Sequence, residues 1–258
     1  MLTQLTATRL REMYLYGMAE ALEDQMEHPA ANEQLSFEDR LDLLVDRELT
    51  YRQHKRVSRL LREARLRLAA RAEDLDFRAA RGLDRGVMRT LAQGDWIERH
   101  QDVLISGPTG VGKTFIACAL ADAACRTGHS ARYFRVPRLL EDLRIAQADG
   151  SLRRLMAQLA RVELLVLDDF GLSPLDSPGA RLLLEVVDDR SERHSTIVAS
   201  QLPFGTWHDV IKDATIADAI LDRWIHRSHH ITLHGDSLRR DPPATVEQDG
   251  LSSAARRS

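Results

Sequence analysis

Apolar residues in the second half of the chain gather in five short continuous runs separated by helical patterns. A continuous apolar run indicates a strand covered on both faces, whereas a half-exposed strand alternates apolar and polar positions. Helices between such strands are the usual crossovers of a parallel sheet. The pattern therefore predicts an α/β domain over residues 81–240. The runs are VLIS (103–106), ARYFRV (131–136), ELLVLD (163–168), STIVAS (195–200) and HITLH (230–234).

The N-terminal part of the chain has no such runs and predicts helices instead. Pro29 divides it into two pieces. Ser36 is followed three residues later by Asp39, a capping box that predicts the start of a longer second helix. Residues 37 to about 71 contain no proline or glycine, so we expect one helix over that span. Residues 1–80 are thus expected to form an all-helical domain that binds DNA or mediates oligomerisation.

The remaining segments suggest a soluble, cytoplasmic protein. Residues 241–258 are polar and aperiodic and contain two prolines, so we expect a disordered tail. No basic N-terminal region precedes an apolar stretch, and no apolar run approaches the ~18 residues of a membrane span. Cys118 and Cys125 lie about two turns apart in one predicted helix, beyond disulfide reach, and are expected to be core residues.

Charge alone does not point to a nucleic-acid partner, because the formal net charge is −3. Basic residues are concentrated locally, however. Residues 47–71 hold nine Arg and Lys but only two Glu. At about 100° per residue, one face of this helix is apolar and the opposite face is a basic ridge. The apolar face consists of Val57, Leu60, Leu61, Ala64 and Leu68. The predicted contacts to duplex phosphates are Arg52, Lys55, Arg56, Arg59 and Arg62. The alternative is a solvated or subunit-pairing face.

The strongest chemical signal is the sequence GPTGVGKT at residues 107–114, between an apolar strand and a helix. It fits the P-loop pattern, in which backbone N–H groups of a glycine-rich loop surround a triphosphate and the helix N-terminus adds positive potential. Lys113 is expected to reach the β- and γ-phosphates, and the Thr114 hydroxyl to ligate Mg²⁺. The predicted ATP-binding residues are Gly107, Pro108, Thr109, Gly110, Val111, Gly112, Lys113, Thr114 and Phe115.

A second motif, LLVLDDF at residues 164–170, is an apolar strand ending in two carboxylates. Two adjacent carboxylates repel each other unless a cation offsets their charge. We therefore predict that Asp168 holds Mg²⁺ and that Asp169 orients the attacking water, as in a Walker B motif. The alternative is an acidic turn after a core strand. A third run, STIVASQLP at residues 195–203, is expected to present Ser200 and Gln201 to the γ-phosphate, because ligands bind at the carboxyl ends of parallel strands.

The order of these motifs resembles that of the IstB-type transposition helper ATPases, which are AAA+ proteins close to the DnaC-type helicase loaders. The similarity covers roughly residues 5–240. It is carried by GPTGVGKT and LLVLDDFG, and more specifically by TIVASQLPFGTWHDVI, ADAILDRWIH and HHITLHGDSLRR. The N-terminal LREMYLYGMAEAL and LSFEDRLDLLVDRE resemble the helical leader of that family.

This resemblance implies an AAA+ fold with strand order 5-1-4-3-2, and a homo-oligomer with ATP at subunit interfaces. It implies that the protein binds and deforms duplex DNA with little sequence preference and stimulates a partner transposase of IstA type. It assigns Ser200 as the sensor 1 residue and Arg223, or else Arg227, as the arginine that completes a neighbour's ATP site. Arg239 or Arg240 would be the cis-acting sensor 2 arginine.

Three other functions fit parts of the sequence. A DnaC-like helicase loader would prefer single-stranded DNA, but no short aromatic-rich helicase-binding segment is evident. A small-molecule kinase would share the P-loop, but no arginine-rich lid follows the core and the basic helix would be unexplained. A nucleotide-gated scaffold would bind ATP with negligible hydrolysis, and turnover with and without DNA separates it from an ATPase.

Overall fold

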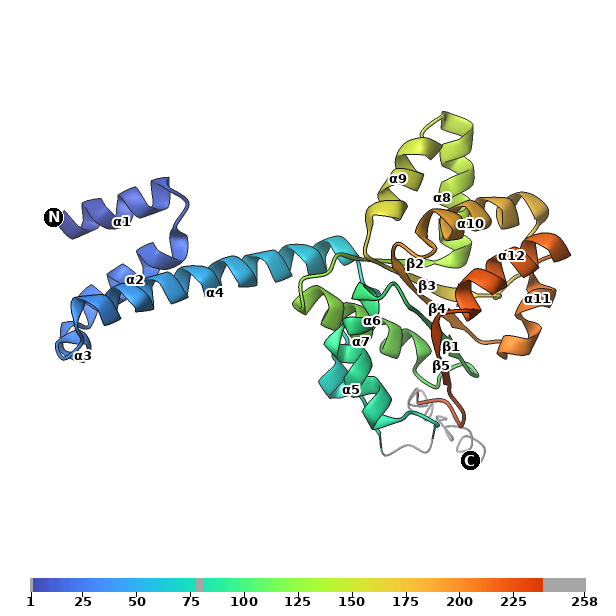
Figure 1. The fold of residues 1–258 in the computed structure, drawn as a ribbon, viewed down its shortest axis with the longest axis horizontal. Coiled ribbons are helices and arrows are strands. Elements are labelled where there is room, and N and C mark those ends of the chain that lie inside the picture. The colour runs from blue at the N-terminus through green and yellow to red at the C-terminus, as the bar shows by residue number, and fades with distance from the viewer. Residues whose placement is uncertain (1, 78–80, 239–258) are drawn as a thin grey trace, which may run out of the picture.

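The computed structural model describes residues 2–77 and 81–238. It consists of a helical arm, residues 2–64, and an α/β core from which the arm projects (Figure 1). The predicted tail and both sensor 2 candidates, Arg239 and Arg240, lie outside the described residues. Among the helices that the structure describes, none has the length and apolar character needed to cross a bilayer.

The core is built on one parallel five-stranded sheet in the order β2-β3-β4-β1-β5. Read from the other edge this is 5-1-4-3-2, so the predicted AAA+ fold is confirmed. The strands match the five apolar runs to within two residues at each end. They are β1 Asp102–Ser106, β2 Ala131–Arg135, β3 Leu164–Phe170, β4 Ser195–Ser200 and β5 Ser228–Thr232.

Helices cover both faces of the sheet, which explains why the three central strands β1, β3 and β4 are buried along almost their whole length. In β1, Val103 and Ile105 pack toward the layer formed by α5, α6, α7 and the end of α4. Leu104, between them, packs toward the opposite layer of α8–α12. The two cysteines are buried and free in α7, as expected. The core helices are α5 Arg85–Gln93, α6 Asp95–Glu98, α7 Lys113–Arg126, α8 Val136–Asp149, α9 Leu152–Arg161, α10 Ser177–Arg190, α11 Trp207–Val210 and α12 Ala214–Ile225, with 3₁₀ turns at Ala72–Asp74 and Phe204–Thr206.

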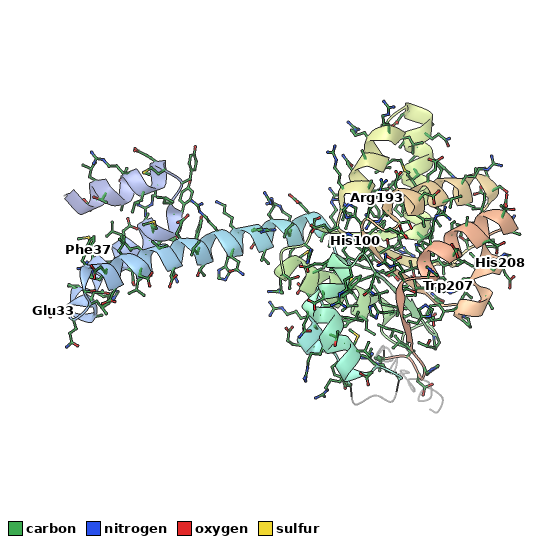
Figure 2. All side chains as sticks on the ribbon, viewed as in Figure 1. Glu33, Phe37, His100, Arg193, Trp207 and His208 are labelled. Carbon is green, nitrogen blue, oxygen red and sulfur yellow. The ribbon has the colours of Figure 1, made fainter. Side chains whose placement is uncertain are left out.

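In the arm, α2 packs along one end of the long helix α4, and α1 and α3 contact α2 (Figure 1, Figure 2). The predicted capping box is present: Ser36 Oγ accepts from the Asp39 N–H at 3.1 Å, and Asp39 Oδ2 accepts from the Ser36 N–H at 3.2 Å. The other end of the long helix is anchored to the core through buried Leu60 and Ala64. The arm helices are α1 Leu2–Glu12, α2 Tyr16–Glu27, α3 Pro29–Asn32 and α4 Phe37–Ala64.

The predicted end of the long helix near residue 71 is wrong, because α4 ends at Ala64. Arg65 has φ +51°, a left-handed conformation that stops the helix without a glycine or proline. The chain then packs half-buried Leu66 and buried Ala70 into the core. Burial of these two residues requires an irregular path, so tertiary packing overrides the local helical tendency. One consequence is that Leu68 is exposed and does not extend the apolar face of α4.

Close backbone contact joins α2 to α4 in the arm. Gly17 lies against α4, where an added Cβ would fall 2.7 Å from the Arg47 carbonyl oxygen and 2.8 Å from the Glu48 Cα. The buried Glu48 carboxylate accepts from the Gly17 N–H at 2.7 Å and from the Met18 N–H at 3.2 Å. Burial alone raises the pKa of Glu48, but the Arg52 guanidinium and these two N–H groups outweigh burial and hold that pKa below its usual value.

We predict that Gly17→Ala separates α2 from α4, because backbone atoms that cannot move independently occupy the space for the methyl group. Overpacking of this kind costs roughly 1–3 kcal/mol. Hydrogen exchange of α1 and α2 should accelerate while exchange in the core is unchanged. Gly205→Ala is the control, because a Cβ there meets nothing within 4 Å. Unchanged exchange in α1 and α2 of Gly17→Ala would contradict the packing described.

Candidate nucleotide-binding site

The predicted P-loop connects β1 to α7 at the carboxyl edge of the sheet. Its three glycines all have positive φ: +147° at Gly107, +89° at Gly110 and +100° at Gly112. At Gly112 an added Cβ would lie 2.7 Å from an Arg81 guanidinium nitrogen. Side chains at these positions would therefore be both strained and obstructed. The result is a loop of exposed backbone leading directly into the N-terminus of a 14-residue helix, which favours an anion.

Lys113, the first residue of α7, is 8% exposed and its ammonium group lies over the loop. Its Nζ donates to the carbonyl oxygens of Gly107 at 2.6 Å and Pro108 at 2.7 Å. These bonds hold a positive charge at the position where the loop would surround phosphates. An ammonium group donates strongly to phosphate oxygens, so this placement suits nucleotide binding.

Thr114 and Asp168 meet at the carboxyl edge of the sheet, as the two motifs predict. The Thr114 hydroxyl donates to Asp168 Oδ2 at 2.7 Å, and the Tyr133 hydroxyl donates to the same oxygen at 2.7 Å. Burial and the neighbouring carboxylate raise the pKa of Tyr133, so its hydroxyl stays protonated. A hydroxyl and a carboxylate are the hard oxygen ligands that Mg²⁺ prefers. The side chains present therefore fit a magnesium ion beside a bound triphosphate.

Asp169 points away from the regular line of its strand. The pairing of β3 with β4 shifts register between Leu167 and Phe170, and Asp169 has φ +60°. This irregularity directs its carboxylate toward the cavity, where Oδ2 accepts from Arg135 Nε at 2.6 Å. Arg67 Nη1 lies 3.7 Å from the same oxygen. Asp169 is thus held between two guanidinium groups in this structure.

One cavity of about 520 Å³ is lined by Lys113, Thr114 and Asp169, and its volume is within the usual ~300–1,000 Å³ range of small-ligand sites. Four cationic side chains and three aspartates line it, so its wall offers positive charge to a phosphate and carboxylates to a cation. Arg81 is buried, and its guanidinium donates to the Val111 carbonyl at 3.0 Å, supporting the loop from below. The lining residues include Arg67, Leu68, Asp74, Asp76, Arg81, Thr109, Lys113, Thr114, Phe115, Arg135, Asp169, Gln201 and Leu238.

At the end of β4 the structure places Gln201, and not Ser200, beside the P-loop. Gln201 lines the cavity, and its Oε1 accepts from the Thr109 hydroxyl at 2.8 Å. Ser200 is fully buried; its hydroxyl donates to the Phe170 carbonyl at 2.7 Å and accepts from the Leu202 N–H at 3.1 Å. Ser200 therefore links two strand ends, whereas the side chain that lines the cavity is that of the next residue.

Arg223 and Arg227 lie at the opposite edge of the sheet from the P-loop. Both line a small cavity that also contains Asp102, the first residue of β1. Arg223 forms an ion pair with Asp188 and donates to the Ala219 carbonyl at 2.6 Å. Arg227 is exposed and forms no ion pair within the described residues. A five-residue strand, roughly 16 Å long, separates both arginines from the loop of their own chain.

The five predicted DNA-contacting residues differ in their surroundings. Arg52 donates to the buried Glu48 at 2.7 Å, and the Lys55 ammonium lies 5.1 Å from the centroid of the Tyr16 ring. Arg56 donates to the Gly128 carbonyl of the core at 2.9 Å. Arg59 and Arg62 are exposed and make no hydrogen bond or ion pair with the described residues. Of the five, Arg59 and Arg62 are the two exposed side chains with no such partner among the described residues.

The sequence motifs do not include four residues of the site. Arg67, Arg81 and Arg135 line the cavity, and Tyr133 contacts Asp168. Arg135 is paired in register with Asp168 at the end of β2, so its position follows once the strand order is known. Tyr133 lies two residues earlier on the same strand and therefore on the same face. The two N-terminal arginines carry no comparable signal, because irregular segments bring them to the site.

The chain is similar to known ATP-binding proteins. The family model of the IstB-like ATP binding proteins matches residues 8–243. A putative insertion sequence ATP-binding protein of Sinorhizobium fredii is 46% identical over 241 residues, which covers 93% of this chain and 98% of the relative. The putative ATP-binding protein of insertion sequence IS1162 from Pseudomonas fluorescens is 53% identical over 207 residues, covering 80% and 89% of the two chains.

Solved structures with the same fold include replication proteins. The crystal structure of DnaI has a TM-score of 0.55 at 19% identity and covers 68% of this chain and 93% of that one. The crystal structure of the DnaC helicase loader has a TM-score of 0.53 at 15% identity, covering 64% and 96%. At these identities the similarity establishes the fold of the α/β core.

Proposed function

The chain belongs to the family of IstB-like ATP-binding proteins, and from that premise we propose that it is an ATP-hydrolysing AAA+ protein that assembles on duplex DNA and stimulates a partner transposase. One observation carries the proposal: Lys113, Thr114 and Asp168 converge at the carboxyl edge of the parallel sheet beside a cavity large enough for a small ligand. ATP binding follows from the family; hydrolysis and the dependence on Mg²⁺ are parts of the proposal.

Each residue of the site has a separate role in the proposed reaction. Lys113 and the N-terminus of α7 would bind and orient the phosphates, and Thr114 and Asp168 would hold Mg²⁺. When bound, that ion neutralises charge on the transferring phosphoryl group. Asp169 would orient the attacking water through its carboxylate, which requires that it separate from Arg135. Gln201 would contact the terminal phosphate, which its bond to Thr109 of the P-loop supports.

Assembly is supported by the positions of Arg223, in α12, and Arg227, which follows that helix. Both line the cavity beside Asp102, away from the P-loop of their own chain, so either would act on the nucleotide of a neighbouring copy. An arginine supplied in trans stabilises transition-state charge and makes hydrolysis dependent on oligomerisation. Arg227 needs no rearrangement, whereas Arg223 would first have to leave Asp188.

DNA binding and the link to transposition rest on the arm and on the relatives. The exposed Arg59 and Arg62 suit contacts with phosphates, which provide affinity without base readout. Several related ATP-binding proteins are named as products of insertion sequences. We infer from this that the DNA-bound assembly serves a transposase of the IstA type. A helicase loader shares the fold, and it is distinguished by a preference for single-stranded DNA.

Sedimentation of the purified protein with duplex or single-stranded DNA, with and without ATP and Mg²⁺, tests the proposal. We expect a large complex only when ATP, Mg²⁺ and duplex DNA are all present, because nucleotide at subunit interfaces and phosphates on the basic surface act together. A preference for single strands would favour the helicase loader. Failure to assemble on either DNA would reopen the small-molecule kinase. Assembly with turnover that DNA does not change would favour the scaffold.

A further inference from the structure

Arg67 reaches the acidic pair of the nucleotide site from the segment that leaves the arm. It lies between Arg65, where α4 ends, and Ala70, which is buried in the core. Its Nη1 is 3.7 Å from Asp169 Oδ2 and 4.0 Å from Asp168 Oδ2. The Tyr133 hydroxyl donates to the same Asp168 oxygen at 2.7 Å. Arg67 thus contacts both carboxylates, and it shares Asp168 Oδ2 with Tyr133.

The Arg67 guanidinium neutralises the same two carboxylates that a divalent cation would neutralise. The acidic pair, Asp168 and Asp169, needs positive charge nearby to offset its own repulsion. In this structure Arg67 and Arg135 supply that charge. A divalent ion bound to Asp168 would lie close to the Arg67 guanidinium, and like charges at such separation repel by an amount that solvent reduces but does not remove.

We propose that Arg67 is a positioning residue that holds the acidic pair and competes with the divalent cation for it, so that loading of metal and nucleotide loosens residues 65–71. The inference rests on the proposed function, because it takes Asp168 as a metal ligand. These residues connect α4, with its exposed basic side chains, to the core. Competition at the carboxylates therefore links occupancy of the nucleotide site to the base of the arm.

Arg67 is better suited to this role than Arg135. Arg135 contacts Asp169 alone and belongs to β2, a strand fixed within the sheet. Arg67 contacts both acids, and its backbone lies in an irregular segment outside the sheet. Arg67 can therefore shift together with its backbone, whereas strand pairing holds the backbone of Arg135.

The direct test is binding of Mn²⁺, as a spectroscopic substitute for Mg²⁺, to the full-length protein with ADP. Arg67→Gln removes the competing charge but keeps a long polar side chain. We expect Mn²⁺ to bind on the order of tenfold more tightly to this variant than to the wild type. Arg67→Lys, which keeps the charge, should bind Mn²⁺ within a few fold of the wild type. Arg71→Gln is the matched control, because Arg71 is an exposed arginine of the same segment that contacts neither acid.

Hydrogen exchange gives a second, independent measurement. Residues 65–71 of the wild type should exchange faster once Mn²⁺ and ADP are bound, and those of Arg67→Gln should exchange fast without ligand. Equal or weaker Mn²⁺ binding to Arg67→Gln, or exchange at residues 65–71 that ligands leave unchanged, would overturn the competition. Binding of ADP and Mn²⁺ by the wild type without a variant effect would refute this inference alone. Absence of binding by the wild type would refute the nucleotide site itself.

Discussion

Replacement of Lys113 by alanine is expected to weaken ATP binding by roughly 10²-fold or more and to abolish ATP-dependent assembly on DNA. In the structure its ammonium is 2.6 Å and 2.7 Å from two loop carbonyls and therefore lies where the phosphates would bind. Each charge-assisted hydrogen bond to a phosphate contributes ~1.5–3 kcal/mol, and every ~1.4 kcal/mol is a tenfold change in affinity. Two such bonds account for the expected loss. Titration with a fluorescent ATP analogue measures it, and sedimentation with duplex DNA measures assembly.

Lys212→Ala is the matched control for this experiment. Lys212 is an exposed lysine that precedes α12 and lies outside the nucleotide cavity, so its loss should leave ATP affinity unchanged. The Lys113 variant should also retain the thermal stability of the wild type to within about 1–2 kcal/mol, because loop carbonyls freed of the ammonium are accessible to water. Assembly of Lys113→Ala on DNA with ATP would show that the nucleotide site has been assigned to the wrong residues.

The sheet was predictable because burial on both faces leaves a direct record in the sequence. β4 is buried at all six positions, and its residues are those of the apolar run STIVAS. The P-loop was predictable for a different reason. Positive φ at three positions favours glycine, and phosphate binding at a helix N-terminus favours lysine, so few other residue types suit these positions. The strand order itself came from the family resemblance and not from periodicity.

Features that depend on packing between distant segments could not be predicted. The end of α4 at Ala64 is determined by burial of Leu66 and Ala70, and no local residue signals it. Ser200 and Gln201 are adjacent, and only their tertiary contacts distinguish them: Ser200 donates to the Phe170 carbonyl, whereas Gln201 accepts from Thr109. Arg67 belonged to the predicted basic helix, so its contact with the acidic pair was hidden within a pattern that suggested DNA.

The contacts of Arg52, Lys55 and Arg56 within the protein make these residues unsuitable for testing DNA binding by substitution. Reversing the charge of Arg52 would place an acid beside the buried Glu48, which already relies on Arg52 for its neutralisation. Reversing Lys55 would put an anion close to the faces of two tyrosine rings. Either change would disrupt the packing of α2 on α4. A loss of DNA binding would then reflect a damaged arm and not a lost phosphate contact. Arg56 has a comparable role, since it attaches α4 to the core.

Reversal of Arg59 and Arg62 together, as Arg59→Glu and Arg62→Glu, is therefore expected to reduce duplex affinity by at least ~10-fold while leaving ATP binding intact. The log–log dependence of affinity on salt should become shallower by about two, since each phosphate contact contributes a slope of ~0.9. Fluorescence anisotropy of a labelled duplex across a salt series measures both quantities.

The control variant carries Arg89→Glu and Arg181→Glu, two exposed arginines of the core, and imposes the same change in net charge. An equal loss in both double variants would show that long-range charge accounts for the binding. A salt slope that is unchanged in Arg59→Glu, Arg62→Glu would mean that α4 does not contact the phosphates, and the DNA surface would then have to lie on the core.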